Sequence, residues 1–203
     1  GARPTGIADA EMAPMLGLAQ RRWYDSEALA RDGGTVYVGL ERVHRIVRFH
    51  FGREGLLARA DPIAVPAAFR AFPSNGSIEA LAFVPRNVPL GGTLIAIAER
   101  GHDDAGNHLA FMIGGPRPGA FTIKRLNDYD ISDATILPGG DLAVLERKFG
   151  WTTGLFVRIR RIPIAELRPG ALVDGPILFE ADLGQQIDNM EGISAHRNSD
   201  GET

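Results

Sequence analysis

Short apolar runs alternate with turn residues along most of the chain, and the runs have the length of strands rather than helices. Three of them are nearly continuous in apolar residues, as expected for strands that are buried on both faces. Each of the three follows a pair of glycines and ends in the dipeptide Glu-Arg. The pattern predicts equivalent buried strands in an all-β fold, at residues 36–40, 94–98 and 142–145.

The segments around these runs repeat as well. An acid followed by a small residue precedes each glycine pair, and a fourth copy lies near the end of the sequence: Glu27, Glu79, Asp133 and Glu191, spaced by 52, 54 and 58 residues. A third strand is predicted at 45–51, 109–113 and 155–162, and a weaker fourth at 56–63, 120–126 and 175–183. Four antiparallel strands at a period of about 50 residues are typical of a β-propeller blade.

We therefore predict a β-propeller built of four-stranded antiparallel blades, as a single domain over residues 1–203. The repeat units are 21–73, 74–127 and 128–185, and residues 186–203 begin a fourth, incomplete unit. Closed propellers have about four to eight blades. We expect a truncated segment of a longer propeller, or self-association that covers its open faces. The alternative is an open β-sandwich of similar strands.

The repeated acids are the first candidates for chemistry, because equivalent positions of successive blades converge on the central channel of a propeller. Carboxylates brought together in a ring repel one another or bind a cation. Oxygen-only ligands favour Ca²⁺ or Mg²⁺ over zinc. The alternative is that each acid accepts backbone N–H bonds and fixes a turn of its blade. Residues 188–192 are the repeat with the densest set of polar ligand types, which favours a functional role there.

The arginines of the Glu-Arg pairs are Arg42, Arg100 and Arg147, and they could hold an anionic group because a guanidinium binds carboxylate or phosphate in a bidentate way. Neighbours on a strand point to opposite faces, so we expect no salt bridge within a pair. Ion pairing with the repeated acids is the favoured alternative. The polar loop from His102 to His108 could bind a metal, but its Gly-Asn step indicates an ordinary turn, which we favour. The polar strand at 159–162 is expected to lie far from the axis.

Composition narrows the classes of function. The 25 glycines and 13 prolines among 203 residues suit an all-β protein with many turns. A net charge of −3 with interspersed signs gives no footprint for nucleic acid, and no apolar run is long enough for a membrane span. The absence of cysteine excludes disulfides and thiolate metal sites. No nucleophile elbow or phosphate-binding glycine loop is present.

The sequence resembles the phytase-like family, described as "esterase-like activity of phytase". The resemblance rests on residues 25–30, 133–149 and 188–193, and it covers the chain from about residue 21 to the end. It implies a β-propeller that is exported from bacteria, hence periplasmic or secreted. Residues 1–10 carry no signal-peptide pattern, so an export signal is expected to be missing or already removed. The site residues carried over are Glu27, Asp133, Asp188, Glu191, Glu146 and Arg147.

We expect a hydrolase of phosphate or carboxylic esters, with Ca²⁺ as a possible cofactor held by the channel carboxylates. Its expected partner is a small-molecule ester or another anionic ligand. Glu191, Asp188 and Asp133 are the predicted catalytic residues, and the predicted substrate-binding residues are Arg42, Arg100 and Arg147. The predicted metal ligands are Glu27, Glu79, Asp133 and Glu191. The alternative is a non-enzymatic propeller that binds a small ligand or peptide at the channel mouth, because the fold hosts both kinds of function.

Overall fold

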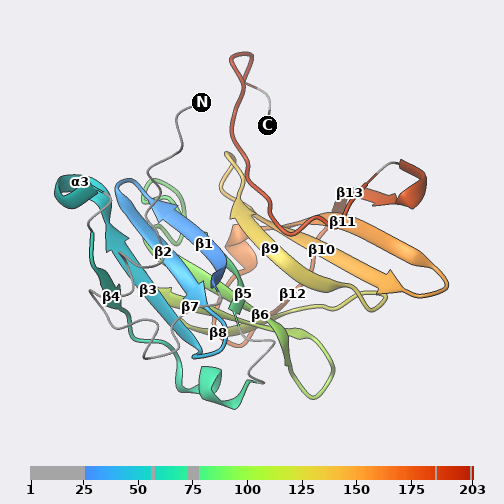
Figure 1. The fold of residues 1–203 in the computed structure, drawn as a ribbon, viewed down its shortest axis with the longest axis horizontal. Helices are drawn as coiled ribbons and strands as arrows, with labels where there is room; N and C mark the ends of the chain where they lie inside the picture. Colours follow the sequence, from blue (N-terminus) through green and yellow to red (C-terminus); the bar gives the residue numbers. More distant parts are fainter. Residues whose placement is uncertain (1–25, 56–57, 73–77, 186, 202) are drawn as a thin grey trace, which may run out of the picture.

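A computed structural model describes residues 26–55, 58–72, 78–185, 187–201 and 203, and within them the chain is all-β, as predicted (Figure 1). The first sheet consists of β1 (Ser26–Asp32), β2 (Thr35–Leu40), β3 (Arg45–His50) and β4 (Ala60–Pro62). The second consists of β5 (Ile78–Phe83), β6 (Thr93–His102), β7 (His108–Gly114) and β8 (Gly119–Ile123). The third consists of β9 (Asp130–Ile136), β10 (Leu142–Gly150), β11 (Gly154–Ile162) and β13 (Ile177–Asp182).

The four strands named for each sheet form an antiparallel meander, and a short parallel strand described below extends the second sheet to five strands. The predicted strands are the second strands β2, β6 and β10; β6 and β10 are buried over the predicted ranges, whereas residues 36–38 of β2 are only partly buried. The prediction of antiparallel strands in groups of four is confirmed. In the hairpins that lead into β6 and β10, Gly92 and Gly140 have φ of 85° and 98°, a left-handed conformation that favours glycine. The paired glycines seen in the sequence therefore mark real turns. Among the described residues the three sheets form no closed ring.

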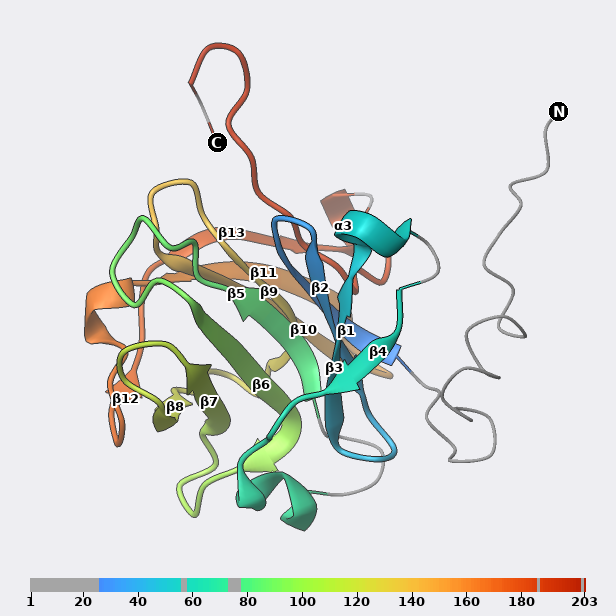
Figure 2. The same ribbon diagram turned by 90° about the vertical axis from the view of Figure 1, so that its left-hand side faces the viewer.

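The connections between the sheets contain short helical turns: α3 (Phe51–Glu54), η2 (Ala67–Ala71), η3 (Ile164–Glu166) and η4 (Leu183–Gln185). One connection also exchanges backbone bonds with a neighbouring sheet. Between β11 and β13 the chain forms β12 (Leu172–Val173), which pairs in parallel with β8 of the second sheet (Figure 2). The third unit is thereby hydrogen-bonded to the second. No helix in the described ranges has the length and apolarity needed to cross a membrane.

The first strands of the three sheets lie side by side, since β1 contacts β5 and β5 contacts β9. In Figure 1 the first sheet lies on the left, the third on the right and the second between them. Alternate residues of β5 pack in opposite directions: Ala80 and Ala82 face the third sheet, while Leu81 and Phe83 face the first. The middle sheet is thus buried on both faces, which is why its strands are almost continuously apolar.

The core between the second and third sheets contains a buried ionic network. Glu146 of β10 accepts hydrogen bonds from Arg158 Nε at 2.6 Å and from Arg160 Nε at 2.8 Å, and all three side chains are at most 1% exposed. Arg160 also donates to Asp174 Oδ1 at 2.7 Å and to the Lys124 carbonyl at 2.8 Å. These bonds reach residues that follow β12 and β8, so the network joins the two sheets.

This network corrects one expectation from the sequence and leaves another as a prediction. The polar strand at 159–162, expected further from the axis, belongs to β11, the third strand of its sheet, and Arg160 is fully buried there with Glu146 and Asp174 as its ionic partners. Glu146, carried over as a site residue, lies on the buried face of β10 instead of in an open cavity. A buried charge is tolerated only when it is paired and hydrogen-bonded, and Glu146 meets both conditions.

We expect Glu146→Ala to destabilise the protein by about 3–5 kcal/mol, because it leaves two buried arginines without their shared carboxylate. The matched control is Asp61→Asn, which breaks an exposed ion pair with Arg48 and is expected to cost less than about 1 kcal/mol. Urea unfolding followed by circular dichroism measures both. Equal losses for the two variants would show that the buried network does not stabilise the fold.

Candidate functional site

Three glutamates from the first two sheets meet where these sheets adjoin. Glu79 lies in β5, Glu99 lies in β6, and Glu41 lies in the turn after β2. All three are half-buried, and each offers a carboxylate oxygen that lies within 4.8 Å of the other two. We call Glu41, Glu79 and Glu99 the glutamate cluster. Carboxylate oxygens at this spacing can hold a metal ion.

Two of the repeated acids reach this region through equivalent β-bulges. The pairing of β1 with β2 skips Glu27, and the pairing of β5 with β6 skips Glu79. A bulge leaves one residue unpaired and re-aims its side chain. In β9 the skipped residue is Ser132, while Asp133 pairs with Leu145. The predicted equivalence therefore holds for Glu27 and Glu79, but Asp133 lies one position further along its strand.

Like charges and burial act together on Glu79. Burial is the largest effect, followed by the nearby carboxylates of Glu99, Glu27 and Glu41, and together they raise the pKa of Glu79 to about 8. Arg147 acts in the opposite direction but does not cancel them. At neutral pH the cluster therefore holds a proton on Glu79 unless a cation takes its place.

Three of the four predicted metal ligands line one cavity of about 690 Å³: Glu27, Asp133 and Glu191. Asp133 Oδ2 accepts the Ile193 N–H at 2.8 Å, which ties residues 187–198 to β9, and burial raises the pKa of Asp133. Among the described residues, the groups whose ligand atoms all lie within 4.8 Å contain only Glu79 of the predicted four. The four acids thus border a common region without forming one set of ligands, and their roles stay predictions.

Arg147 ties the segment around Glu191 to β10. Its Nη1 donates to Asn189 Oδ1 at 2.8 Å and to Glu191 Oε1 at 2.9 Å, and Asn189 Nδ2 donates to the same Glu191 oxygen at 2.7 Å. Asp188 is exposed, and its Oδ1 accepts the Asn189 N–H at 2.7 Å. The guanidinium of Arg147 is therefore fixed in place by two neighbours on an otherwise irregular segment.

A second cavity of about 750 Å³ is lined by Arg147. We call it the basic cavity after Arg125, Arg147 and Lys148, which line it together with the acids Glu99, Asp128 and Asp130. Glu99 also belongs to the glutamate cluster, so the cluster borders the basic cavity directly. Carboxylates that could hold a cation and cationic side chains that could hold an anion therefore share one wall.

The other Glu-Arg pairs differ from expectation. Arg100 Nε lies 3.3 Å from Glu99 Oε2, so the expectation of no salt bridge within a pair is wrong here. The reason is that the pairing of β6 with β7 is irregular between Ile97 and His102, which breaks the strict alternation of side chains. Arg42 lies exposed in the turn after β2, and neither Arg42 nor Arg100 lines the two cavities described above.

Sequence reasoning overlooked the acids of the Glu-Arg pairs as ligands, although Glu41 and Glu99 complete the glutamate cluster. Their signal was the repeated dipeptide, of which only the arginines and Glu146 were considered as site residues. The third copy is out of register with the others: Glu146 pairs with Ile131 as Ala98 pairs with Ile78, across equivalent bulges. A shift of one residue reverses the face of a strand, so Glu146 is buried where Glu99 is accessible.

Comparison with known proteins places these observations in a family. A family model described as "Phytase-like: Esterase-like activity of phytase" matches residues 1–203. A search of curated proteins found no match. A crystal structure of a protein of unknown function from Bacteroides caccae is similar with a TM-score of 0.36 and 10% identity, covering 79% of this chain and 61% of that one. The chain thus spans less than two thirds of the length of that protein.

We expect the stability of the metal-free protein to fall as the pH rises from about 4.5 to about 8, as far as Glu79 contributes. In this window the folded protein keeps the Glu79 proton that the unfolded chain has released, so rising pH favours unfolding. Glu79→Gln removes this contribution, and the variant should gain stability relative to wild type between pH 5 and pH 8.

Urea midpoints measured in the presence of a chelator test this, with the exposed Glu166→Gln as control. The buried histidines titrate in both proteins, so the difference between variant and wild type isolates Glu79. Parallel pH profiles for wild type and Glu79→Gln would contradict the electrostatic account of the cluster.

Proposed function

Because this chain belongs to the phytase-like family, described as esterase-like activity of phytase, we propose that it hydrolyses esters of phosphoric or carboxylic acid. The observation that carries the proposal is the position of Glu99. Its carboxylate belongs to the glutamate cluster and also lines the basic cavity beside Arg147 and Lys148. A cation and an anionic ester bound at these two places would be neighbours.

Glu41, Glu79 and Glu99 are the residues that would hold the cation, and their all-oxygen donor set suits Ca²⁺. A bound Ca²⁺ would polarise the ester oxygen and lower the pKa of a coordinated water. Glu79 must release its proton when it becomes a ligand, so the affinity for the cation should rise with pH up to about 8. Binding of the cation would also relieve the repulsion between the carboxylates that disfavours an ionised Glu79.

Within the basic cavity, Arg147 and Lys148 offer donors for a phosphate group that a neutral carboxylic ester lacks, while Glu99, Asp128 and Asp130 add negative charge to the same lining. Arg147 is held by Asn189 and Glu191, so its guanidinium is oriented before substrate arrives, which lowers the entropic cost of binding. Lys148 adds a second positive charge to the same wall. None of the predicted catalytic acids lines the basic cavity: Asp133 and Glu191 line the 690 Å³ cavity, and Asp188 is exposed, so their catalytic roles stay predictions.

The propeller fold and the location of the protein belong to the same proposal. Three meander sheets whose first strands lie side by side support a propeller, with β1, β5 and β9 nearest its axis. Both cavities and the glutamate cluster include residues of these first strands, as a site at a channel mouth requires. The family resemblance supports a periplasmic or secreted protein.

We expect Ca²⁺-dependent hydrolysis of p-nitrophenyl phosphate, abolished by a chelator and restored by Ca²⁺. Glu99→Gln should remove the dependence on Ca²⁺ and most of the activity, because it replaces the carboxylate that the glutamate cluster and the basic cavity share with a neutral amide. The exposed Glu166→Gln is the matched control and should behave as wild type. Absence of turnover on phosphate and carboxylic esters, with and without Ca²⁺, would favour the alternative of a binding protein.

We expect Arg147→Gln to separate the two ester classes. Loss of a charge-assisted hydrogen bond should raise KM for p-nitrophenyl phosphate by roughly 10- to 100-fold. KM for the uncharged p-nitrophenyl acetate should change much less, because that ester offers no anionic group to the guanidinium. Steady-state kinetics on both substrates measure the ratio. An equal rise for both esters would indicate a purely structural role for Arg147 in holding the segment around Glu191.

A further inference from the structure

A second group of possible metal ligands contains two histidines that face each other across the β6–β7 hairpin. His102 at the end of β6 and His108 at the start of β7 are direct cross-strand partners. The turn between them is fixed by Asp103, whose Oδ1 accepts the N–H of Ala105 at 2.9 Å and the N–H of Asn107 at 2.8 Å. The hairpin therefore holds the two imidazole rings together, with their centroids 5.0 Å apart.

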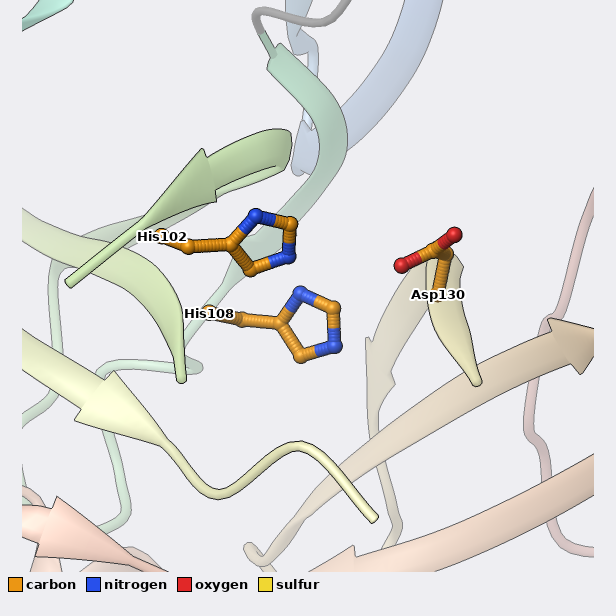
Figure 3. A group of neighbouring side chains, drawn as sticks. All are labelled: His102, His108 and Asp130. Atoms are coloured by element: carbon orange, nitrogen blue, oxygen red, sulfur yellow. The ribbon is translucent and has the colours of Figure 1, made fainter. Parts of the chain in front are cut away.

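Each ring has one buried nitrogen that lacks a hydrogen-bond partner among the described residues. These atoms are His102 Nε2 and His108 Nδ1, and the whole of His108 is 0% exposed. Leaving a buried polar atom unpaired costs free energy, and such atoms in native proteins call for an explanation such as a bound ion. The unpaired nitrogens of this hairpin are the same ones that approach each other in Figure 3.

Asp130 completes the group from the third sheet. Asp130 contributes a carboxylate oxygen, and His102 and His108 each contribute a ring nitrogen. These three ligand atoms all lie within 4.8 Å of one another. Figure 3 shows the carboxylate of Asp130 directed toward the two rings. We infer that His102, His108 and Asp130 form a binding site for a divalent transition-metal ion of the zinc class.

The surroundings orient two of the three ligands, His108 and Asp130, in the manner of metal sites. His108 Nε2 lies 3.1 Å from the Tyr129 carbonyl, so the proton sits on Nε2 and the lone pair of Nδ1 faces His102. Arg125 Nε donates to Asp130 Oδ1 at 3.0 Å and holds the carboxylate. Hydrogen bonds of this kind, from a second layer of residues, fix the ring orientation of ligating histidines and the position of ligating carboxylates.

The donor set favours zinc over calcium. Imidazole nitrogens suit Zn²⁺, Co²⁺ and Fe²⁺, whereas Ca²⁺ takes oxygen ligands. Burial lowers the pKa of both histidines, that of His108 to about 4, so the rings are neutral and able to ligate at neutral pH. Asp130 also lines the basic cavity, so one of the three ligands lies at the wall of that cavity. Three protein ligands leave one position of a tetrahedral ion for water.

The test is a titration of the chelator-treated protein with Co²⁺, which reports its coordination through visible absorption bands. We expect one Co²⁺ per chain, displaced by Zn²⁺ and not by Ca²⁺. His102→Gln should weaken binding by at least about tenfold, and Asp130→Asn by about tenfold or more. His196→Gln, an exposed histidine outside the group, is the matched control and should bind as wild type. Circular dichroism in chelator shows whether each variant is folded.

Three results would overturn the inference: absence of Co²⁺ bands in wild type, unchanged affinity in both ligand variants, or loss of binding in Glu99→Gln alone. The last would place the ion at the glutamate cluster. Asp130→Asn keeps the test decisive if His102→Gln does not fold, because the Asp130 side chain is 40% exposed and its replacement disturbs little packing. The site is independent of the proposed ester hydrolysis, since the readout requires no substrate.

Discussion

The charge of Glu146 is the constraint on which the packing of the second and third sheets depends. Two arginines of β11 enter an otherwise apolar core because one carboxylate of β10 accepts hydrogen bonds from both, and Arg160 continues to Asp174. Burial of ion pairs gains little stability over apolar packing, but removal of one partner is costly. The observed placement of the strands satisfies these buried charges, and it also brings Arg147, the next residue of β10, to the wall of the basic cavity.

The opposite situation holds where the first two sheets adjoin. Burial, followed by the neighbouring carboxylates of Glu99, Glu27 and Glu41, raises the pKa of Glu79, and the nearby Arg147 does not offset them. Both regions arise from the same architecture. A middle sheet that is apolar on both faces leaves polar side chains room only at bulges and strand ends, where the sheets meet. Charges gathered there are either matched, as around Glu146, or left to bind a proton or a ligand, as around Glu79.

The sequence predicted the strands better than the site, for physical reasons. Continuous apolar runs and paired glycines are local signals, and they located β2, β6 and β10. The repeated acids located Glu27 and Glu79 at equivalent bulges. However, the side that a residue faces depends on where each bulge falls, and a bulge at Ser132 instead of Asp133 has no mark in the sequence. Glu146 is likewise shifted by one residue relative to Glu99, which places it on the buried face of β10. The hairpin histidines resembled an ordinary turn because Asp130, their third partner, comes from another sheet.

The end of β6 determines the geometry of both possible metal sites. Regular pairing with β7 stops at Ile97 and resumes at His102, so the residues between them are positioned by contacts other than the ladder. Gly101 makes this possible: a Cβ there would lie 2.7 Å from the Cβ of Ala98 and 2.7 Å from a ring carbon of Phe72. Because the irregular stretch packs this closely, Glu99 stays with the carboxylates of the first sheet while His102 returns to face His108. One strand end thus separates a hard-oxygen ligand set from a nitrogen-containing one, and two ions of different chemistry could be held apart along a single strand.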